Sequence, residues 1–502
     1  MSSARQFKLG AILSYFSIFV NIITGLVFTP WVIRTIGKED YGLYTLAMSV
    51  ISLFLFDFGL GSAVTRFLSK YLAHQDQKSA DSFLGIVYKL YISIDIILIL
   101  VLLGVYFFIP SIYAQLSTDE IEKFKVVYAI AAIYSICSFP FIPVNGILTA
   151  HEKFIQSKLC DVINKFIIVV SMTICLALGW GLYALVLVNA FAGLITISNK
   201  IWCIYHFTKQ RIRWSYANWH NYQEIASYSG WVTLKSLAQR CIMNIAPSIL
   251  GILSGSTEIA VLGIAITLEG YTYMFSSAIG GMFLPKVSRV IAKDNDILPL
   301  MVKVGRIQFI VVGLIVTGVL IFGHEFIHYW VGDGFSDSYL CAVLMIIPSF
   351  IHLPQEIAHQ TIYVYNKVQL EARIFCIMAI VNVVLAFALS PIWGAKGIGL
   401  SICIAYFVRT IGMDYIYVKY MNLDILSFFR ESLFKMIIPL IFISSFGIVM
   451  NYLVSSHSLV AFVIRIILYT TIYFMIFYQF VMNNFEKNLI LDIGRRIYKI
   501  IR

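Results

Sequence analysis

The chain has 502 residues, of which 60% are hydrophobic and only 13% are charged, and its formal net charge is +11. Soluble globular proteins carry about 25% charged residues, so this composition excludes an ordinary soluble domain and indicates a membrane protein. The basic balance does not indicate nucleic-acid binding, because the Lys and Arg residues lie in short groups between long apolar segments, where they can face anionic lipid headgroups.

The apolar segments are about 20 residues long, the length of helix that crosses the hydrocarbon core of a bilayer. About fourteen are present, and they are predicted at 10–33, 42–65, 83–109, 126–149, 161–179, 182–204, 227–250, 258–284, 307–327, 340–364, 374–393, 398–418, 434–454 and 460–482. Spans 161–179 and 182–204 share one short turn, so a count of about twelve or thirteen stays open. The sequence therefore predicts an all-α polytopic membrane protein.

The positions of Lys and Arg predict the orientation of these spans. If there are fourteen, alternate connections and both termini hold most of the 37 basic residues, whereas the opposite connections hold only Arg34, Lys38, Lys123, Lys125 and Lys396. Because basic residues concentrate in cytoplasmic loops, we expect both termini to be cytoplasmic. The first apolar run is too long for the core of a signal peptide and is expected to be the first transmembrane helix.

The eight cysteines are scattered in or beside the apolar spans, without a Cys-x-x-Cys pair and without His at ligand spacing. We therefore expect them to be packing residues, and we expect no metal site and no cofactor.

The organisation of the chain repeats. Sliding the first half along the second brings corresponding segments together, among them Gly37 with Gly255, Phe139-Pro140 with Leu353-Pro354, Glu152-Lys153 with Asn366-Lys367 and Gly181-Leu182 with Gly397-Ile398. Two parallel six-helix halves are typical of transporters, which bind substrate between the halves. The predicted parts are an N-terminal lobe at 1–206, a cytoplasmic connection at 207–226, a C-terminal lobe at 227–420, and two further helices with a basic tail at 421–502.

Ionisable residues inside the spans are costly in lipid and by default face a cavity or a partner. Among them are Asp57, Lys89, Asp95, Lys235, Arg240, Glu269, Glu356, Arg409 and Arg465. We expect Lys89 and Arg465 to extend to an interface. Asp95 and Arg409 fit a structural ion pair or a cavity equally well. Two cations on one helix, Lys235 and Arg240, are hard to explain by packing and indicate that this helix faces an anion.

Glu356 lies four residues after His352 and three before His359, so all three side chains can share one helical face. That spacing would allow a metal, but Pro354 disturbs the turn and no fourth ligand is evident. A proton relay or a hydrogen-bonded structural cluster is the preferred interpretation.

The residues of the first two spans resemble those of a known family. Leu9-Gly10-Ala11-Ile12, the segment from Val32 to Tyr44 and the segment from Asp57 to Phe67 are similar to the start of Wzx-type oligosaccharide flippases, which are polysaccharide transporters of the multidrug/oligosaccharidyl-lipid/polysaccharide exporter superfamily. The resemblance implies two lobes around a cationic cavity. It also implies alternating-access transport of undecaprenyl-pyrophosphate-linked oligosaccharide from the cytoplasmic to the outer leaflet of the bacterial inner membrane, for O-antigen (lipopolysaccharide), capsule or exopolysaccharide synthesis. Many relatives carry an acidic residue where this chain has Asn244 to Pro247.

From this resemblance we expect Lys235 and Arg240 to face the pyrophosphate and Arg34 to lie near the outer mouth. Asp57, Glu269 and Glu356 are the expected switch residues, which would bind H⁺ or Na⁺. Arg66, on the opposite helical face from Asp57, is expected to be a headgroup anchor.

The partners are then the lipid-linked oligosaccharide, membrane lipids and, in the cell, polysaccharide polymerase machinery. Two other functions stay open. A multidrug exporter of the same superfamily would share the fold, although it would favour an acidic cavity. A membrane glycosyltransferase or polymerase would need an acidic pair on an outer loop, and only short loops with Asp119, Glu120 and Glu122, or Asp333 and Asp337, offer one.

Overall fold

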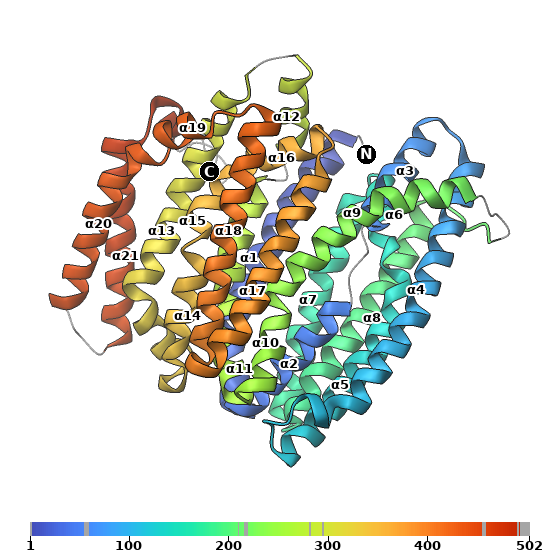
Figure 1. Ribbon diagram of the computed structural model, residues 1–502, viewed down its shortest axis with the longest axis horizontal. Helices are drawn as coiled ribbons and strands as arrows, with labels where there is room; N and C mark the ends of the chain where they lie inside the picture. The colour runs from blue at the N-terminus through green and yellow to red at the C-terminus, as the bar shows by residue number, and fades with distance from the viewer. Residues whose placement is uncertain are drawn as a thin grey trace, which may run out of the picture. The chain divides into compact units, whose positions relative to one another are not determined.

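The computed structural model describes residues 3–54, 60–208, 210–214, 219–280, 283–293, 296–453, 458–488 and 491. Within these residues the regular elements are all helical (Figure 1). The predicted all-α fold class is confirmed.

The first half of the chain contains ten α-helices and one short 3₁₀ helix. They are α1 (Ser3–Ile36), α2 (Lys38–Phe54), α3 (Leu60–Ala73), α4 (Gln77–Ile112), α5 (Thr118–Ser138), η1 (Phe139–Phe141), α6 (Pro143–Ala150), α7 (Phe154–Ala177), α8 (Gly181–Phe207), α9 (Trp219–Met243) and α10 (Ile245–Leu253).

The second half continues with eleven α-helices and three short segments of other helix types. They are α11 (Ser256–Gly280), α12 (Leu284–Ile291), α13 (Leu298–Val331), η2 (Asp333–Phe335), α14 (Asp337–Ile346), α15 (Ser349–His352), η3 (Leu353–Gln355), α16 (Glu356–Val364), α17 (Val368–Trp393), α18 (Ala395–Met421), α19 (Ile425–Glu431), α20 (Phe434–Leu453), α21 (Leu459–Ile476) and η4 (Phe477–Val481).

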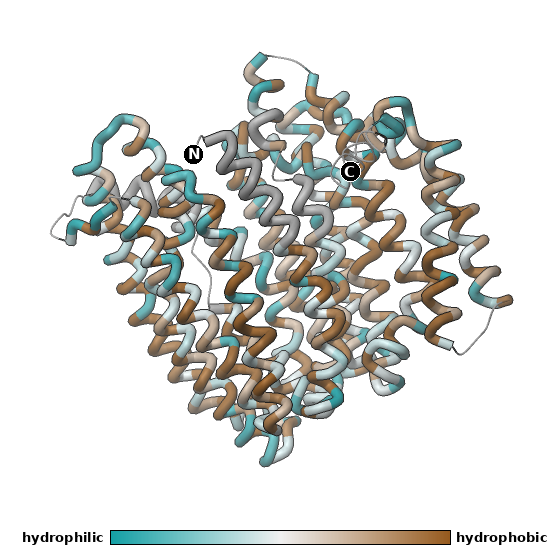
Figure 2. Tube along the Cα trace, turned by 180° about the vertical axis from the view of Figure 1, so that it is seen from behind, coloured by the Kyte–Doolittle hydropathy of each residue, from teal (hydrophilic) through white to brown (hydrophobic). Residues whose placement is uncertain are grey.

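Eleven of the described helical stretches are long and apolar enough to cross a membrane, and the bent pair α9–α10 makes a twelfth if it is one span. The predicted spans 42–65 and 258–284, which are absent from these twelve, both run into residues outside the described ones. The count of fourteen therefore stays a prediction. Figure 2 shows hydrophobic residues along the long helices and hydrophilic residues at helix ends and connections.

Proline explains where the predicted spans are broken. Span 126–149 divides at Pro140 and Pro143 into α5, η1 and α6, and span 340–364 divides at Pro348 and Pro354 into α14, α15, η3 and α16. Proline removes a backbone donor and clashes with the preceding turn, so the helix stops or tightens there. Such interruptions inside a membrane are tolerated where the backbone is buried in protein.

The backbone repeats as the sequence predicts. The 3₁₀ helices η1 and η3 precede the short helices α6 and α16, which are followed by turns whose residues Glu152 (φ 56°) and Asn366 (φ 54°) both adopt left-handed conformations. The corresponding glycines Gly37 (φ 89°) and Gly255 (φ 96°) precede α2 and α11. One pairing needs correction: α8 and α18 have equal lengths, so Gly181, the first residue of α8, corresponds to Ala395 rather than to Gly397.

Two compact units emerge from the contacts within the chain. Unit 1 comprises Met1–Ile264 with Ala372–Ser401, and unit 2 comprises Ala265–Glu371 with Ile402–Arg502. Unit 1 combines the predicted N-terminal lobe with part of the C-terminal lobe, whereas unit 2 combines other parts of the C-terminal lobe with the last two helices. The predicted lobe boundaries stay a prediction.

In unit 1, α7 packs lengthwise against α8 and α1 (Figure 1). The connection at 210–214 is irregular and binds the start of α4, where the Asp81 carboxylate accepts hydrogen bonds from the Gln210 side chain (2.6 Å) and the Arg211 backbone N–H (3.0 Å). A Cβ on Gly85 would lie 2.1 Å from the carbonyl oxygen of Arg213. Glycine is therefore required where this connection crosses α4.

In unit 2, α13 is the central helix and contacts α14, α16, α20 and α21. Arg306 of α13 forms a buried bidentate ion pair with Glu486, with Nε–Oε1 and Nη2–Oε2 distances of 2.6 and 3.0 Å. Arg465, on α21, is 4% exposed and is paired with Glu325. The expectation that Arg465 extends to an interface is therefore wrong, because a carboxylate from α13 satisfies it inside the unit.

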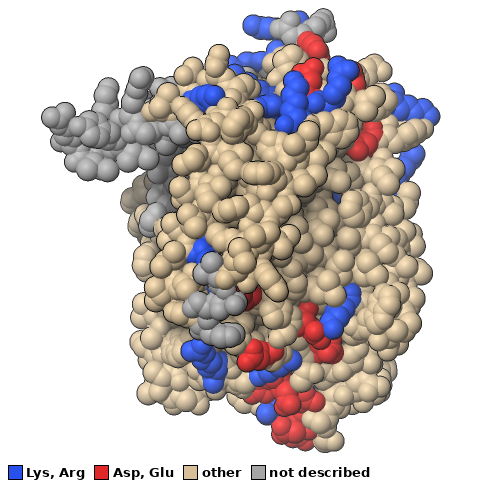
Figure 3. Space-filling model, turned by 90° about the vertical axis from the view of Figure 1, so that its left-hand side faces the viewer, with Lys and Arg blue, Asp and Glu red and all other residues tan. Residues whose placement is uncertain are grey.

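The charged residues lie mostly toward the helix ends. In the face that Figure 3 draws, charged side chains lie mostly toward its upper and lower ends, with a wide band of mainly uncharged side chains between them. Such a band is typical of a surface in contact with lipid.

Candidate functional site

A group of ionisable side chains lies inside unit 2, where the proline-broken span brings α16 against its neighbours. Pro354 closes the short helix η3, so that Glu356 becomes the first residue of α16. His352 ends α15 one turn earlier. The break therefore turns a continuous apolar span into a place where polar groups face the interior.

His359 connects two carboxylates. Its Nε2 lies 2.8 Å from Oε1 of Glu371, and its Nδ1 lies 3.7 Å from Oε1 of Glu356. The Gln360 side chain donates a hydrogen bond to the same oxygen of Glu356. Glu371, at the start of α17, is fully buried. A neutral imidazole has one donor and one acceptor nitrogen, so this order of groups can pass a proton between Glu356 and Glu371.

Arg409 of α18 is the cation that these groups share. It acts electrostatically on Glu356 and His352 and also on Glu269 of α11. Glu269 is 7% exposed and lies beside the Tyr406 hydroxyl. The structure therefore brings together the two predicted switch residues of unit 2, Glu269 and Glu356, around one guanidinium.

The second histidine has a different role. The Nδ1 of His352 lies 3.0 Å from the carbonyl oxygen of Pro348, which can only accept a hydrogen bond, so Nδ1 carries the proton. The His352 ring also lies 5.4 Å from the ring of Tyr406, measured between centroids. His352 therefore orients the wall of the site and leaves its Nε2 as the available acceptor.

A cavity of ≈ 40 Å³ lies between these side chains, and its wall includes His352, Glu356, His359, Arg409, Thr410 and Tyr417. A water molecule needs about 10–15 Å³ measured in this way, so the cavity has room for a few waters or one small cation. Hydroxyl, carboxylate and imidazole groups around such a space can relay protons.

The carboxylates outnumber the cation. Arg409 acts on Glu269 and Glu356, and Glu371 contacts His359 on the same group, so carboxylates gather in a low-dielectric interior where negative charges repel one another. Protonation of one carboxylate, or the entry of a further cation, would relieve this repulsion. Among the described residues, no group of three or more His, Cys, Asp and Glu side chains has the geometry to hold a metal ion.

The predicted cations of unit 1 have separate neighbours. The Lys235 ammonium lies 5.5 Å from the ring centroid of Phe375, and Arg240 donates a hydrogen bond to the carbonyl oxygen of Ser52. Both residues are on α9, which bends by 41° into α10 at Asn244.

Arg34 is exposed in the last turn of α1. Asp57 lies outside the described residues.

Sequence reasoning misses several buried partners. Glu371 lies outside the predicted spans. Only Val368, Gln369 and Leu370 separate it from Lys367, so the sequence around it has the character of a polar connection. Asp414 lies inside predicted span 398–418, where sequence reasoning does not single it out. Asp161 and Lys200 lie near the ends of their predicted spans, yet they pair at 2.6 Å. The available signal is their position inside helices whose neighbouring residues are apolar.

Residues 8–292 match the family described as "Polysaccharide biosynthesis protein". The chain belongs to this family. Its match covers more than half of the residues and includes the segments that resemble flippases in the first two spans. No curated protein matches the chain.

Among solved structures, this polysaccharide biosynthesis protein is similar to the lipid II flippase MurJ in an inward closed conformation. The identity is 14%, the match covers 94% of this chain and 99% of that chain, and the TM-score is 0.70. It is also similar to an inward-facing multidrug resistance MATE family transporter of the MOP superfamily, with 12% identity, 83% and 97% coverage and a TM-score of 0.64.

A third similar structure is a MOP superfamily transporter from Pyrococcus furiosus with a binding pocket of reversed polarity, with 13% identity, 83% and 95% coverage and a TM-score of 0.58. At these identities the structural likeness shows the fold. The protein thus has the fold shared by these flippases and exporters, and it is a multi-pass membrane protein.

Proposed function

We propose that this polysaccharide biosynthesis protein is a proton-coupled flippase. It moves polyprenyl-pyrophosphate-linked oligosaccharide from the cytoplasmic to the outer leaflet of the bacterial inner membrane by alternating access, with both termini cytoplasmic. The observation that carries the coupling is the Glu356–His359–Glu371 series, of which Glu371 is fully buried, beside Arg409 and Glu269. The family and the fold support transport rather than catalysis.

The order of the three side chains supports a proton relay. His359 accepts a proton at Nδ1 from Glu356 and releases the proton of Nε2 to Glu371, so the imidazole is neutral before and after the transfer. Loss of the proton leaves an additional buried carboxylate near Arg409, which changes the attraction between α16, α11 and α18. Each protonation state then favours one arrangement of these helices, which is the requirement for coupling.

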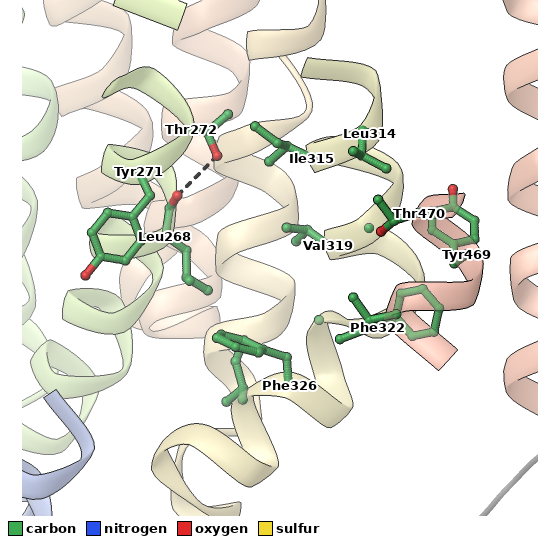
Figure 4. A pocket seen from close by; sticks show the side chains of 14 residues that line it. Leu268, Tyr271, Thr272, Leu314, Ile315, Val319, Phe322, Phe326, Tyr469 and Thr470 are labelled. Atoms are coloured by element: carbon green, nitrogen blue, oxygen red, sulfur yellow. Dashed lines mark hydrogen bonds between the residues drawn. The ribbon is translucent and has the colours of Figure 1, made fainter. Parts of the chain in front are cut away.

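A lipid substrate also needs an apolar surface, and unit 2 has one. A cavity of ≈ 290 Å³ is lined by α11, α13 and α21, with Leu268, Ile315, Val319, Phe322 and Phe326 on its walls (Figure 4). The Thr272 hydroxyl is already satisfied, because it donates to the carbonyl oxygen of Leu268 at 3.1 Å. Such an apolar wall can hold a hydrocarbon chain without exposing it to water, which supports a lipid cargo.

The pyrophosphate carries negative charge and requires cations. Lys235 and Arg240, on α9, are proposed to face it, and Arg34 is proposed to contact the headgroup near the outer surface. Asp57 is proposed as a second switch residue.

Transport in proteoliposomes tests this function. Purified protein is reconstituted with a lipid-linked oligosaccharide in one leaflet, a pH gradient is imposed, and the sugar that reaches the other leaflet is measured by its accessibility to a lectin. We expect the wild type to accelerate transfer when the gradient is present. Glu356→Gln should abolish the response to the gradient, whereas Glu122→Gln, which removes a carboxylate from the first turns of α5, should leave it unchanged.

The controls separate the alternatives. No transfer by the wild type would refute the flippase function, and transfer that ignores both the gradient and Glu356→Gln would refute the coupling site. Transfer driven by a Na⁺ gradient alone would identify Na⁺ as the coupling ion. Efflux of an organic cation, without lipid transfer, would support a multidrug exporter, for which the carboxylates around Arg409 and the MATE fold are the favouring observations.

The glycosyltransferase alternative gains less from the structure. At the start of α5, Glu120 completes a capping box with Ser117, and Asp119 pairs with Lys123 at 3.2 Å. Asp333 pairs with His328. These acidic residues have local structural contacts, so no observation on the described residues favours a catalytic pair among them.

A further inference from the structure

A second polar cluster lies in unit 1, on α7 and α8. Lys200 donates hydrogen bonds to Oδ1 of Asp161 (2.6 Å) and to Oδ1 of Asn145 (2.9 Å). Lys158 lies 3.4 Å from the other oxygen of Asp161. Lys165 follows Asp161 by one helical turn on the same face. Among the described residues, no hydrogen bond or ion pair joins Lys165 to a partner.

The cluster faces away from lipid. The exposed side of α7 is a stripe of apolar residues, namely Leu159, Ile163, Phe166, Val170 and Ile174, each between 39% and 57% exposed. At 100° per residue, Asp161 and Lys165 lie on the opposite side of the helix, in line with the buried residues Met172 and Leu176. The polar face is therefore turned into the protein.

Lys165 lies near the middle of α7, a candidate membrane span, whereas Asp161 and Lys200 lie closer to the ends of their helices. α7 begins at Phe154, so a rise of 1.5 Å per residue places Lys165 about 16 Å along the helix. That distance is near the middle of a hydrocarbon core about 30 Å thick. An ammonium group at this depth is costly and marks a cavity or a partner.

The charge of the cluster is not balanced by its neighbours. α7 packs against α1, α6 and α8, and Asp161 is the single Asp or Glu in the sequences of these four helices. Lys158 and Lys200 share this carboxylate and Lys165 lies one helical turn from it, which leaves two positive charges in excess among the described residues of the cluster. A group with two negative charges would balance them.

At the position of the second repeat that corresponds to Lys200, the residue has the opposite charge. Superimposing α8 on α18 by their ends relates Lys200 to Asp414, and the same superposition relates Lys158 and Lys165 of α7 to Ala372 and Ala379 of α17. The lysines are thus not a requirement of the shared backbone, because the second repeat builds the same helices without them.

We propose that Lys158 and Lys165 bind a phosphate group carried on a lipid, with Lys200 as the positioning residue that holds Asp161 between them. This inference rests on the proposed function, for which the pyrophosphate of the lipid carrier is the matching ligand. Lys158 is 41% exposed at its side chain, so it can be reached while Lys200, 10% exposed, stays on Asp161. The Asn164 side chain on the same face has a buried oxygen with no hydrogen-bond donor, which a sugar hydroxyl would satisfy.

Direct binding tests the site. The protein is placed in nanodiscs of neutral phosphatidylcholine, and the dissociation constant of radiolabelled undecaprenyl pyrophosphate is measured for the wild type and for Lys165→Gln, Lys165→Arg and Lys78→Gln. Loss of a charge-assisted contact corresponds to roughly tenfold weaker binding or more. We expect that loss for Lys165→Gln only. Lys78→Gln removes the same charge from an exposed site in unit 1, and Lys165→Arg retains the charge.

A second arm identifies the source of the phosphate. Phosphatidylglycerol replaces part of the neutral lipid, and its competition with undecaprenyl pyrophosphate is measured. If phosphatidylglycerol competes in the wild type but not in Lys165→Gln, the site binds anionic phospholipid headgroups. If phosphatidylglycerol does not compete in the wild type, the site binds the pyrophosphate carrier. Equal affinity of the wild type and Lys165→Gln in both arms, with an unchanged melting temperature, would overturn the inference.

The outcome is separable from that of the transport assay. If the wild type transports lipid and Lys165→Gln binds undecaprenyl pyrophosphate as the wild type does, the flippase function is supported and this binding site is refuted. If Lys165→Gln weakens binding but the wild type transports no lipid, the binding site is supported and the flippase function is refuted.

Discussion

Replacing Arg306 with Met should destabilise unit 2 strongly. Its guanidinium forms the bidentate pair with Glu486 and also donates to the carbonyl oxygens of Val481 (2.7 Å) and Glu431 (3.2 Å). Glu486 is 3% exposed, so the substitution leaves a buried carboxylate without its cation. Breaking a buried ion pair from one side costs about 3–5 kcal/mol.

The double variant Arg306→Met/Glu486→Leu removes both charges and should recover part of that loss. The two stranded carbonyl groups still cost about 1 kcal/mol each, so the double variant should lie roughly 2 kcal/mol below the wild type. The double variant should therefore be about 1–3 kcal/mol more stable than Arg306→Met alone.

Reversible unfolding in mixed micelles of SDS and a mild detergent gives the free energies, and Arg430→Met is the matched control. Arg430 is exposed on α19, so its loss should cost less than about 1 kcal/mol. A single variant Arg306→Met that unfolds like this control would refute the reasoning. So would a double variant less stable than either single variant.

Two other predictions concern α4. Gly85→Ala should destabilise the protein by about 1–3 kcal/mol in the same unfolding assay, because its new Cβ would lie 2.1 Å from the carbonyl oxygen of Arg213 and force one backbone away; an unchanged free energy would show that the 210–214 connection does not bind α4. At the start of that helix, the Ser79 hydroxyl and backbone N–H hold the pKa of Asp76 below its usual value. The ionised carboxylate stabilises the first turn, so this stabilisation is present above the unfolded pKa and is lost as the pH falls through the lower, folded pKa. Hydrogen exchange at the Ser79 amide should therefore lose protection in that acidic range in the wild type, and Asp76→Ala should lack protection at every pH; identical protection in both proteins would contradict the cap.

Much of the fold can be predicted because a bilayer imposes a simple rule on the sequence. A span needs about 20 apolar residues, and each of the twelve candidate spans in the described part of the chain overlaps a predicted one. The repeat is also visible in the sequence, because Pro140 and Pro354 stand at corresponding positions of the two halves. Each proline interrupts an α-helix there. The irregular connection at 210–214 is not predictable, since its form depends on Asp81, which lies about 130 residues away in the chain.

The site in unit 2 can be predicted in part. Glu356 and His359 are recognisable because ionisable residues inside apolar spans are rare, but their partners Glu371 and Arg409 come from other helices. No spacing rule connects residues on different helices, so the grouping of these side chains becomes visible only once α16, α17 and α18 are placed. The opposite error concerns Arg465, for which the sequence suggests an exposed interface and the structure provides Glu325 as a buried partner.

The two repeats use one backbone for opposite charges, and this difference bears on mechanism. In the superposition of the repeats, Asn145 of α6 accepts a hydrogen bond from Lys200, whereas its counterpart His359 of α16 contacts Glu371. The first repeat therefore concentrates positive charge at these positions, and the second concentrates carboxylates and imidazole. A transporter that exchanges protons for an anionic lipid needs both kinds of site and must keep their charges separate, because a lysine beside the relay would pair permanently with its carboxylates. If this division is functional, Asp414→Lys, which copies the first repeat into the second, should abolish the response to a pH gradient while leaving the binding of undecaprenyl pyrophosphate intact. Loss of both properties would show that the two sites are not independent.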